Sequence, residues 1–218
     1  MKKVLGEKQS VAWFKLSEFI GRGEKERALG LFRLLTHSLT HRAFIKKLEA
    51  EILIQFEDLQ GLQTYVQAAH FYKLDGDLVQ AVSIYETLVE LEPERTEYLE
   101  KVVTLFTELG NEEKRIQYQK ILYQAFLAKG WLDKSAIIFE LIKNSLDGVE
   151  KLAYHQAFVV AALKNRYPQQ EAITIHLKKA LDGHLRFSPD VELSKFLLTV
   201  QQLNSIWHKD AVTYLEQN

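Results

Sequence analysis

The sequence predicts an all-α protein, a solenoid of about twelve antiparallel helices that forms one domain over residues 1–218. Apolar residues recur at i, i+3, i+4 and i+7 along nearly the whole chain, which is the spacing of an amphipathic helix. Sustained period-two alternation, the pattern of a half-buried strand, does not appear. Ten glycines and three prolines among 218 residues leave few places for long loops.

Glycines and short polar side chains divide this pattern into helices. The expected spans are 9–20, 24–38, 41–57, 59–74, 77–91, 95–109, 112–128, 131–145, 149–165, 168–181, 189–203 and 205–216. Thr40 and Asp58 are the expected N-caps of the third and fourth helices, because their side-chain oxygens can accept a free backbone N–H. Ser188-Pro189-Asp190 predicts another helix start, and Gly183 predicts a break before it.

The stretch 62–94, LQTYVQAAHFYKLDGDLVQAVSIYETLVELEPE, contains two helical patterns that meet at a glycine. Ala69 and Ala81 are small enough to let two helices approach closely, and tyrosines beside them fill the remaining space. Gly76 can adopt a positive φ without the penalty of a Cβ atom, which suits a tight turn between helices. Pro93 cannot continue the second helix, because it has no N–H.

This stretch resembles a tetratricopeptide repeat, a helix–turn–helix unit of about 34 residues. The residues that match the family pattern are Tyr65, Ala69, Tyr72, Gly76, Ala81, Tyr85 and Pro93. The resemblance implies a right-handed α–α superhelix. The expected hairpins are 24–57, 59–91, 95–128, 131–165 and 168–203, with capping helices at 9–20 and 205–216.

Glycine spacings leave the phase of the helix pairing open in the first sixty residues. Gly76 and Gly110 are 34 residues apart, the period of the family. However, Gly23, Gly76, Gly130 and Gly183 follow one another at intervals of 53, 54 and 53, which is about three helices.

In tetratricopeptide proteins the first helix of each hairpin lines the groove that binds a partner, so the resemblance implies a set of partner-binding residues. These are Gln63, Val66, His70 and Lys73, and, one repeat later, Glu97, Glu100, Thr104 and Thr107. An acidic stretch overlaps the second group: nine glutamates lie between Glu86 and Glu113. It is either a solvated helix face or a docking patch for a basic partner. Trp13 and Trp207, on the terminal helices, either pack in the core or serve as anchors for a partner.

Composition and motifs favour a protein without catalytic activity. A net charge of −1 argues against a general nucleic-acid binder. The chain has no cysteine, which excludes disulfides and thiolate metal sites. His37 and His41 straddle the expected turn at Thr40 and lack a completing glutamate, so a polar hairpin end is favoured over a metal site. Neither a nucleophile-elbow serine nor a glycine-rich phosphate loop is found. We therefore expect no cofactor and no metal.

The longest apolar run, Ala157 to Leu163, is seven residues, and the N-terminal residues do not form a secretory signal. We expect a cytoplasmic protein without a membrane span, or a mature fragment. The favoured function is a non-catalytic scaffold or adaptor that binds a protein or peptide. The alternatives are a dedicated chaperone or assembly factor for one client protein, and an oligomerising structural subunit.

Overall fold

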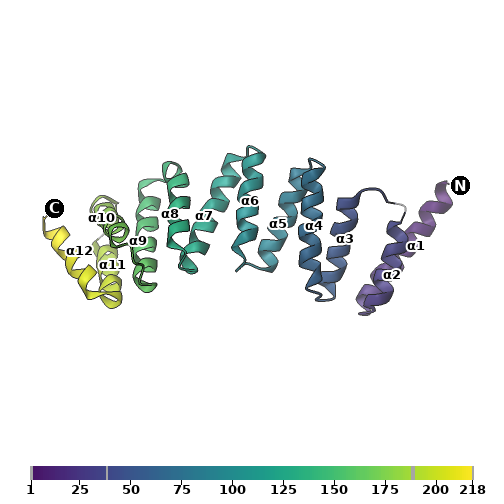
Figure 1. Cartoon of the computed structure of the whole chain (residues 1–218), viewed down its shortest axis with the longest axis horizontal. Helices are drawn as coiled ribbons and strands as arrows, with labels where there is room; N and C mark the ends of the chain where they lie inside the picture. The colour runs from purple at the N-terminus through teal and green to yellow at the C-terminus, as the bar shows by residue number, and fades with distance from the viewer. Residues whose placement is uncertain (1, 38, 188–189, 218) are drawn as a thin grey trace. The chain divides into compact units, whose positions relative to one another are not determined.

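A computed structural model describes residues 2–37, 39–187 and 190–217, and these residues form twelve α-helices and no strand (Figure 1). The helices are α1 (Lys2–Gly21), α2 (Lys25–Thr36), α3 (Arg42–Gln55), α4 (Gln60–Leu74), α5 (Leu78–Leu91), α6 (Thr96–Glu108), α7 (Glu112–Ala128), α8 (Leu132–Ile142), α9 (Gly148–Lys164), α10 (Gln170–Phe187), α11 (Asp190–Leu203) and α12 (Ser205–Gln217). A 3-10 turn, η1 (Lys143–Ser145), follows α8. The all-α prediction is confirmed, and α1 begins seven residues earlier than expected.

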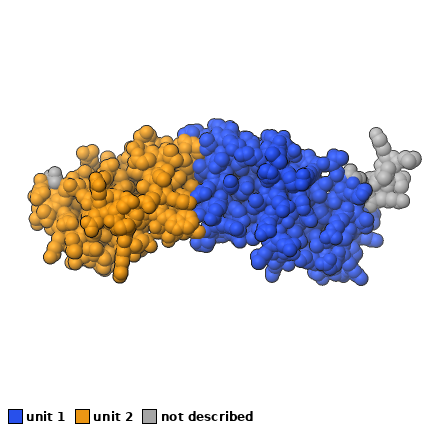
Figure 2. All heavy atoms as spheres, viewed as in Figure 1, with its two compact units in different colours: residues 1–112 blue, residues 113–218 orange. Residues whose placement is uncertain are grey.

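The chain divides into two compact units, Met1–Glu112 and Glu113–Asn218, which Figure 2 shows in different colours. In unit 1, α1 packs on α2, α3 along α4, α4 along α5 and α5 along α6. In unit 2, α9 packs along α10, and α11 packs on α9 and α12. Within each unit, helices that follow one another in sequence are antiparallel neighbours in space (Figure 1), which is the tetratricopeptide-like arrangement. That residues 1–218 form a single solenoid stays a prediction.

One type of C-terminal cap reverses the chain after several of these helices. At Gly76 (φ +79°), the glycine N–H donates to the Lys73 carbonyl at 3.1 Å, and the Asp77 N–H donates to the Tyr72 carbonyl at 2.9 Å. This pair of bonds is the Schellman motif, which needs a residue in the left-handed conformation. The same pair of bonds and a positive φ occur at Gly23, Glu57, Gly110, Gly130 and Arg166. Glycine therefore marks only part of these turns.

The structure corrects two local predictions and supports a third in part. The predicted break at Gly183 is wrong, because this residue lies inside α10, where it lets the helix approach α9. A Cβ atom on Gly183 would lie 3.1 Å from the Leu152 side chain. The N-cap of α3 is His41 rather than Thr40, since His41 Nδ1 accepts the Phe44 N–H at 3.1 Å. Asp58 does accept a backbone N–H, from Gln60 at 2.8 Å, although the N-cap of α4 is the next residue, Leu59.

The predicted helix start at Ser188-Pro189-Asp190 falls partly on residues 188 and 189, which lie outside the described residues; α11 begins at Asp190. His41, one of the two candidate metal ligands, uses its ring nitrogen to cap α3. In the part of the chain that the structure describes, no three side chains of histidine, cysteine, aspartate or glutamate are grouped to hold a metal ion.

Large residues pack against small ones in unit 1, as the sequence predicts. Ala69 and Ala81 are almost completely buried, and Tyr65 and Tyr72 are buried close to them in the sequence. Near the N-terminus, Trp13 is half-buried and packs against a cluster of residues from α1, α2 and α3. The tryptophan therefore contributes to the core of this unit.

A buried histidine, His155, and a half-buried one, His176, lie side by side in unit 2. His155 Nδ1 lies 2.9 Å from His176 Nδ1, and the His176 ring stacks on Phe158 with ring centroids 3.9 Å apart. A hydrogen bond between these two nitrogens needs one as donor and the other as acceptor, so the accepting ring must be neutral. Burial lowers the pKa of His155 to about 3 and that of His176 to about 4, well below the usual 6.5.

The substitution Gly76→Ala tests the turn at Gly76. It should lower the free energy of unfolding by about 1–2 kcal/mol, because a Cβ atom is unfavourable in the left-handed conformation. No atom lies within 4 Å of that Cβ position, so the expected loss of stability comes from the backbone conformation and not from a steric clash. Gly30→Ala is the matched control: Gly30 is exposed inside α2, also with free space. It should raise stability by about 0.5–1 kcal/mol. Urea unfolding followed by circular dichroism measures both, and equal effects of the two substitutions would contradict the turn assignment.

The histidine pair predicts a loss of stability in acid. Both folded-state pKa values are depressed, so the unfolded chain binds more protons below pH 6.5, and stability falls as the pH drops from 6.5 towards 4. In the double variant His155→Phe/His176→Phe this part of the pH dependence should disappear, whereas the exposed control His37→Phe should keep it. Thermal melting at several pH values compares the three proteins. A double variant with the wild-type pH dependence would show that the pair is not the cause.

Candidate functional site

The four predicted partner-binding residues of α4 follow one stripe of the helix surface. Gln63, His70 and Lys73 are exposed, and Val66 is half-buried. They recur every three or four residues, so they share a face of the helix, while the alanines and tyrosines at the positions between them are turned towards the core.

The predicted residues of α6 form a similar stripe. Glu97, Thr104 and Thr107 are exposed, and Glu100 is half-buried. The Thr104 hydroxyl donates to the Glu100 carbonyl, and the Thr107 hydroxyl donates to the Val103 carbonyl, each at 2.8 Å. Both threonines thus satisfy their hydroxyl groups within their own helix, and either can be replaced without leaving a buried polar group unpaired.

A pocket of about 290 Å³ lies between α4, α5 and α6 and brings part of the prediction together. Of the eight predicted residues it collects His70, Lys73 and Thr104. The other five, Gln63, Val66, Glu97, Glu100 and Thr107, lie on the same two helices outside the pocket. Sequence reasoning missed Lys101 and Tyr85, which also line it. The helical spacing could have predicted Lys101, because it lies three residues before Thr104 and four after Glu97, on the same helix face.

The small residues of the helix contact explain why there is room for a pocket. Ala69 and Ala81 line it where larger side chains would fill the space, and Leu74, Tyr85 and Leu105 supply an apolar surface around them. The Tyr85 ring packs against that of Tyr98, with centroids 6.2 Å apart. Polar side chains from α4 and α6 surround this apolar surface. The pocket can therefore accept an apolar side chain of a peptide whose neighbouring groups are polar.

An ion pair joins the two stripes. Lys73 Nζ lies 2.6 Å from Glu108 Oε1, which connects α4 with α6. The Lys73 and Glu108 side chains are 46% and 36% exposed, so solvent screens the pair and its contribution to stability is small. Its effect is to neutralise Lys73 beside the pocket.

Part of the acidic stretch is neutralised in the same way. Glu92 pairs with Arg95 at 2.9 Å, and Glu108 pairs with Lys73. Glu90, Glu94 and Glu97 are exposed near the end of α5 and the start of α6. The negative potential that remains therefore concentrates at this end of the two helices.

Comparison with known proteins gives limited matches. No model of a known protein family matches the chain. The chain is 35% identical over 74 aligned residues to BBSome complex member BBS4 from Bos taurus, and the match covers 31% of this chain and 14% of that protein. Among solved structures, a chain from the structure of Naa15/Naa10 bound to HypK-THB aligns with 96% of this chain, at 12% identity and a TM-score of 0.26, over 39% of its own length. Among the described residues, no helix is both long and apolar enough to cross a membrane.

Proposed function

We propose that the chain is a non-catalytic adaptor that binds a protein or peptide partner along α4 and α6. The observation that carries this proposal is the pocket between α4, α5 and α6, which His70, Lys73 and Thr104 line together. A partner segment lying on these two helices would insert one apolar side chain against Leu74 and Leu105. Its neighbouring polar groups would then meet the exposed side chains of the two stripes.

Exposed glutamates outside the pocket favour a partner segment with basic residues. Glu97 lies on α6 about two helical turns before Thr104, on the same face, and Glu90 and Glu94 are exposed close to it in the sequence. A lysine or arginine of the partner could approach these carboxylates while the apolar side chain occupies the pocket. Attraction between unlike charges would chiefly accelerate association.

The likeness to BBS4 supports a role within an assembly, because that protein is named as a member of a complex. The matched stretch is a small part of BBS4, so the partner of this chain is inferred from its own surface. We place the protein in the cytoplasm as part of the same proposal.

Filling the pocket should abolish partner capture. In Thr104→Trp, an indole ring would occupy the space that we assign to the partner, and the fold should persist because Thr104 is exposed. The test is affinity capture from the native cell extract with wild-type and variant proteins as bait, quantified by mass spectrometry. A protein retained by the wild type should be lost with Thr104→Trp.

Two other tryptophan variants serve as controls. Thr107→Trp lies on the same helix outside the pocket, and Thr213→Trp lies on α12; both replace an exposed threonine. We expect a smaller loss of capture with Thr107→Trp and none with Thr213→Trp. Equal loss with Thr104→Trp and Thr213→Trp would reject the pocket as the binding site.

Charge reversal at Glu97 tests the basic partner. Glu97→Lys should slow association with the captured partner and make its binding less dependent on salt, because a favourable long-range attraction is removed. Glu171→Lys is the matched control, since Glu171 is also an exposed acidic residue in the first turn of a helix, α10. Stopped-flow kinetics at several salt concentrations measures both. An association rate that does not respond to Glu97→Lys would exclude a basic contact there.

A further inference from the structure

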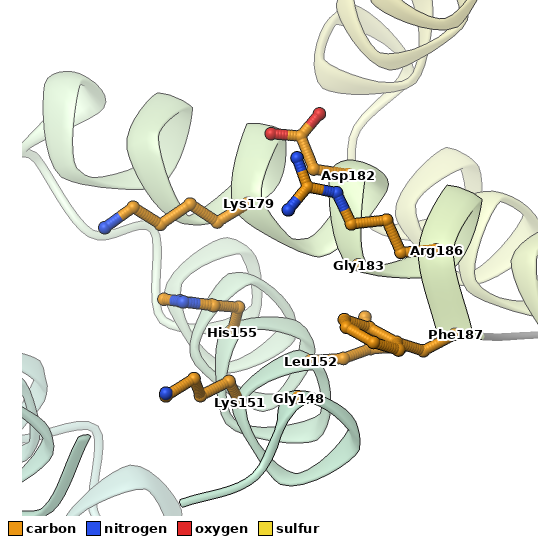
Figure 3. A pocket seen from close by; sticks show the side chains of 9 residues that line it. All are labelled: Gly148, Lys151, Leu152, His155, Lys179, Asp182, Gly183, Arg186 and Phe187. Atoms are coloured by element: carbon orange, nitrogen blue, oxygen red, sulfur yellow. The ribbon is translucent and has the colours of Figure 1, made fainter. Parts of the chain in front are cut away.

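A second pocket, in unit 2, carries three cationic side chains in its lining. It has a volume of about 350 Å³ and lies between α9 and α10. Lys151 and His155 of α9 and Lys179 and Arg186 of α10 line it, with Asp182 as the one acidic residue of its lining. In Figure 3 the side chains of Lys151, His155 and Lys179 extend to the same side of the two helices. The cationic groups of this lining are Lys151, Lys179 and Arg186, against the single carboxylate of Asp182.

Close helix packing creates the apolar part of this pocket. Gly183 faces Leu152 across the contact between α10 and α9, where a Cβ atom would approach Leu152 to 3.1 Å. At the start of α9, a Cβ atom on Gly148 would lie 2.6 Å from the Phe187 ring. Phe187 is 53% exposed, so its ring offers a surface beside the charged groups. The pocket thus combines cations with an apolar wall.

Nearby acidic groups are already engaged. Asp182 accepts a hydrogen bond from the Tyr214 hydroxyl at 2.8 Å. Glu150, in the first turn of α9, pairs with Lys120 at 2.6 Å and accepts the Asp147 N–H at 3.1 Å. The structure assigns no ion pair to Lys151, Lys179 or Arg186 among the described residues. Their charge is available to a ligand.

His155 adds a hydrogen-bonding group to the lining of the pocket. Its Nδ1 is engaged with His176 Nδ1, which leaves Nε2 as the ring nitrogen available to a ligand. When His176 donates the shared proton, His155 carries its own proton on Nε2 and can donate it. A bound carboxylate would favour this tautomer, without any charge on either ring.

We infer that this pocket docks an acidic peptide segment of a partner protein, whose carboxylate side chain pairs with Lys151, Lys179 and Arg186. An adjacent apolar side chain of the peptide packs on Leu152 and Phe187. The mixed lining favours such a segment over a bare phosphate ion, which has no group for the apolar wall and carries more charge against Asp182. The inference concerns a separate site and does not rest on the proposed function of α4 and α6.

The probe is a fluorescein-labelled synthetic peptide of alternating glutamate and leucine with an amidated C-terminus. Fluorescence anisotropy against the full chain measures its binding at low salt. We expect the glutamate peptide to bind and its glutamine–leucine counterpart to bind about tenfold more weakly, because charge-assisted hydrogen bonds are stronger than neutral ones. Equal binding of both peptides would overturn the inference, as would no binding of either.

Neighbouring lysines of α10 give the matched variants. Lys179→Gln removes a cation of the pocket and should weaken binding of the glutamate peptide about tenfold. Lys178→Gln removes the same charge at the adjacent position, where the ammonium group lies over the Tyr214 ring instead, and should change binding by less than about twofold. Equal effects of the two substitutions would show that the total charge of the protein controls binding, and would reject this pocket as the peptide-binding site.

Asp182→Asn should act in the opposite direction. It removes the negative charge of the lining and keeps an oxygen that can accept the Tyr214 hydroxyl, so the glutamate peptide should bind more tightly. Circular dichroism verifies that each variant is folded. Weaker binding by Asp182→Asn would overturn the inference. So would displacement of the peptide by inorganic phosphate at constant ionic strength, which would identify an anion site without peptide specificity.

Discussion

The fold depends on a left-handed residue at the end of a helix, which reverses the chain within a few residues. At Gly76, and in the same way at Glu57 and Arg166, the N–H groups of this residue and the next satisfy carbonyls that the helix end would otherwise leave unpaired. The reversal places the next helix antiparallel and within packing distance. Within each unit, successive helices can then bury apolar surface against their neighbours, as α4 does against α3 and α5.

Small residues at the helix contacts determine where the pockets form. Ala69 and Ala81 allow α4 and α5 to approach and leave room beside Tyr85, and Gly183 allows α10 to approach Leu152 of α9. In both places polar side chains of the outer faces surround an apolar wall. The packing that stabilises each unit thus also produces the surface that we expect a partner to use.

The two pockets differ in the charged groups around them, although each is formed by helices of one unit. The α4–α6 pocket is lined by Lys73, which Glu108 neutralises, and by Lys101. The exposed glutamates that we propose attract a basic segment lie outside this pocket, near the start of α6. In the α9–α10 pocket, Lys151, Lys179 and Arg186 outnumber Asp182, and acidic segments are favoured. A net charge of −1 for the whole chain conceals this difference, because charges of both signs cancel in the sum.

The sequence by itself determined the helices, since the apolar period and the turn at Gly76 are local properties of the chain. It also predicted that His70, Lys73 and Thr104 lie on the surface, because the helical period places them away from the buried faces of α4 and α6. Only the tertiary structure showed the features that depend on contacts between helices. Gly183 reads as a break in the sequence but is a packing residue in α10, and Glu57 and Arg166 adopt a conformation that their residue types disfavour. The cations that meet between α9 and α10 are up to 35 residues apart, so only the packing of the two helices brings them together.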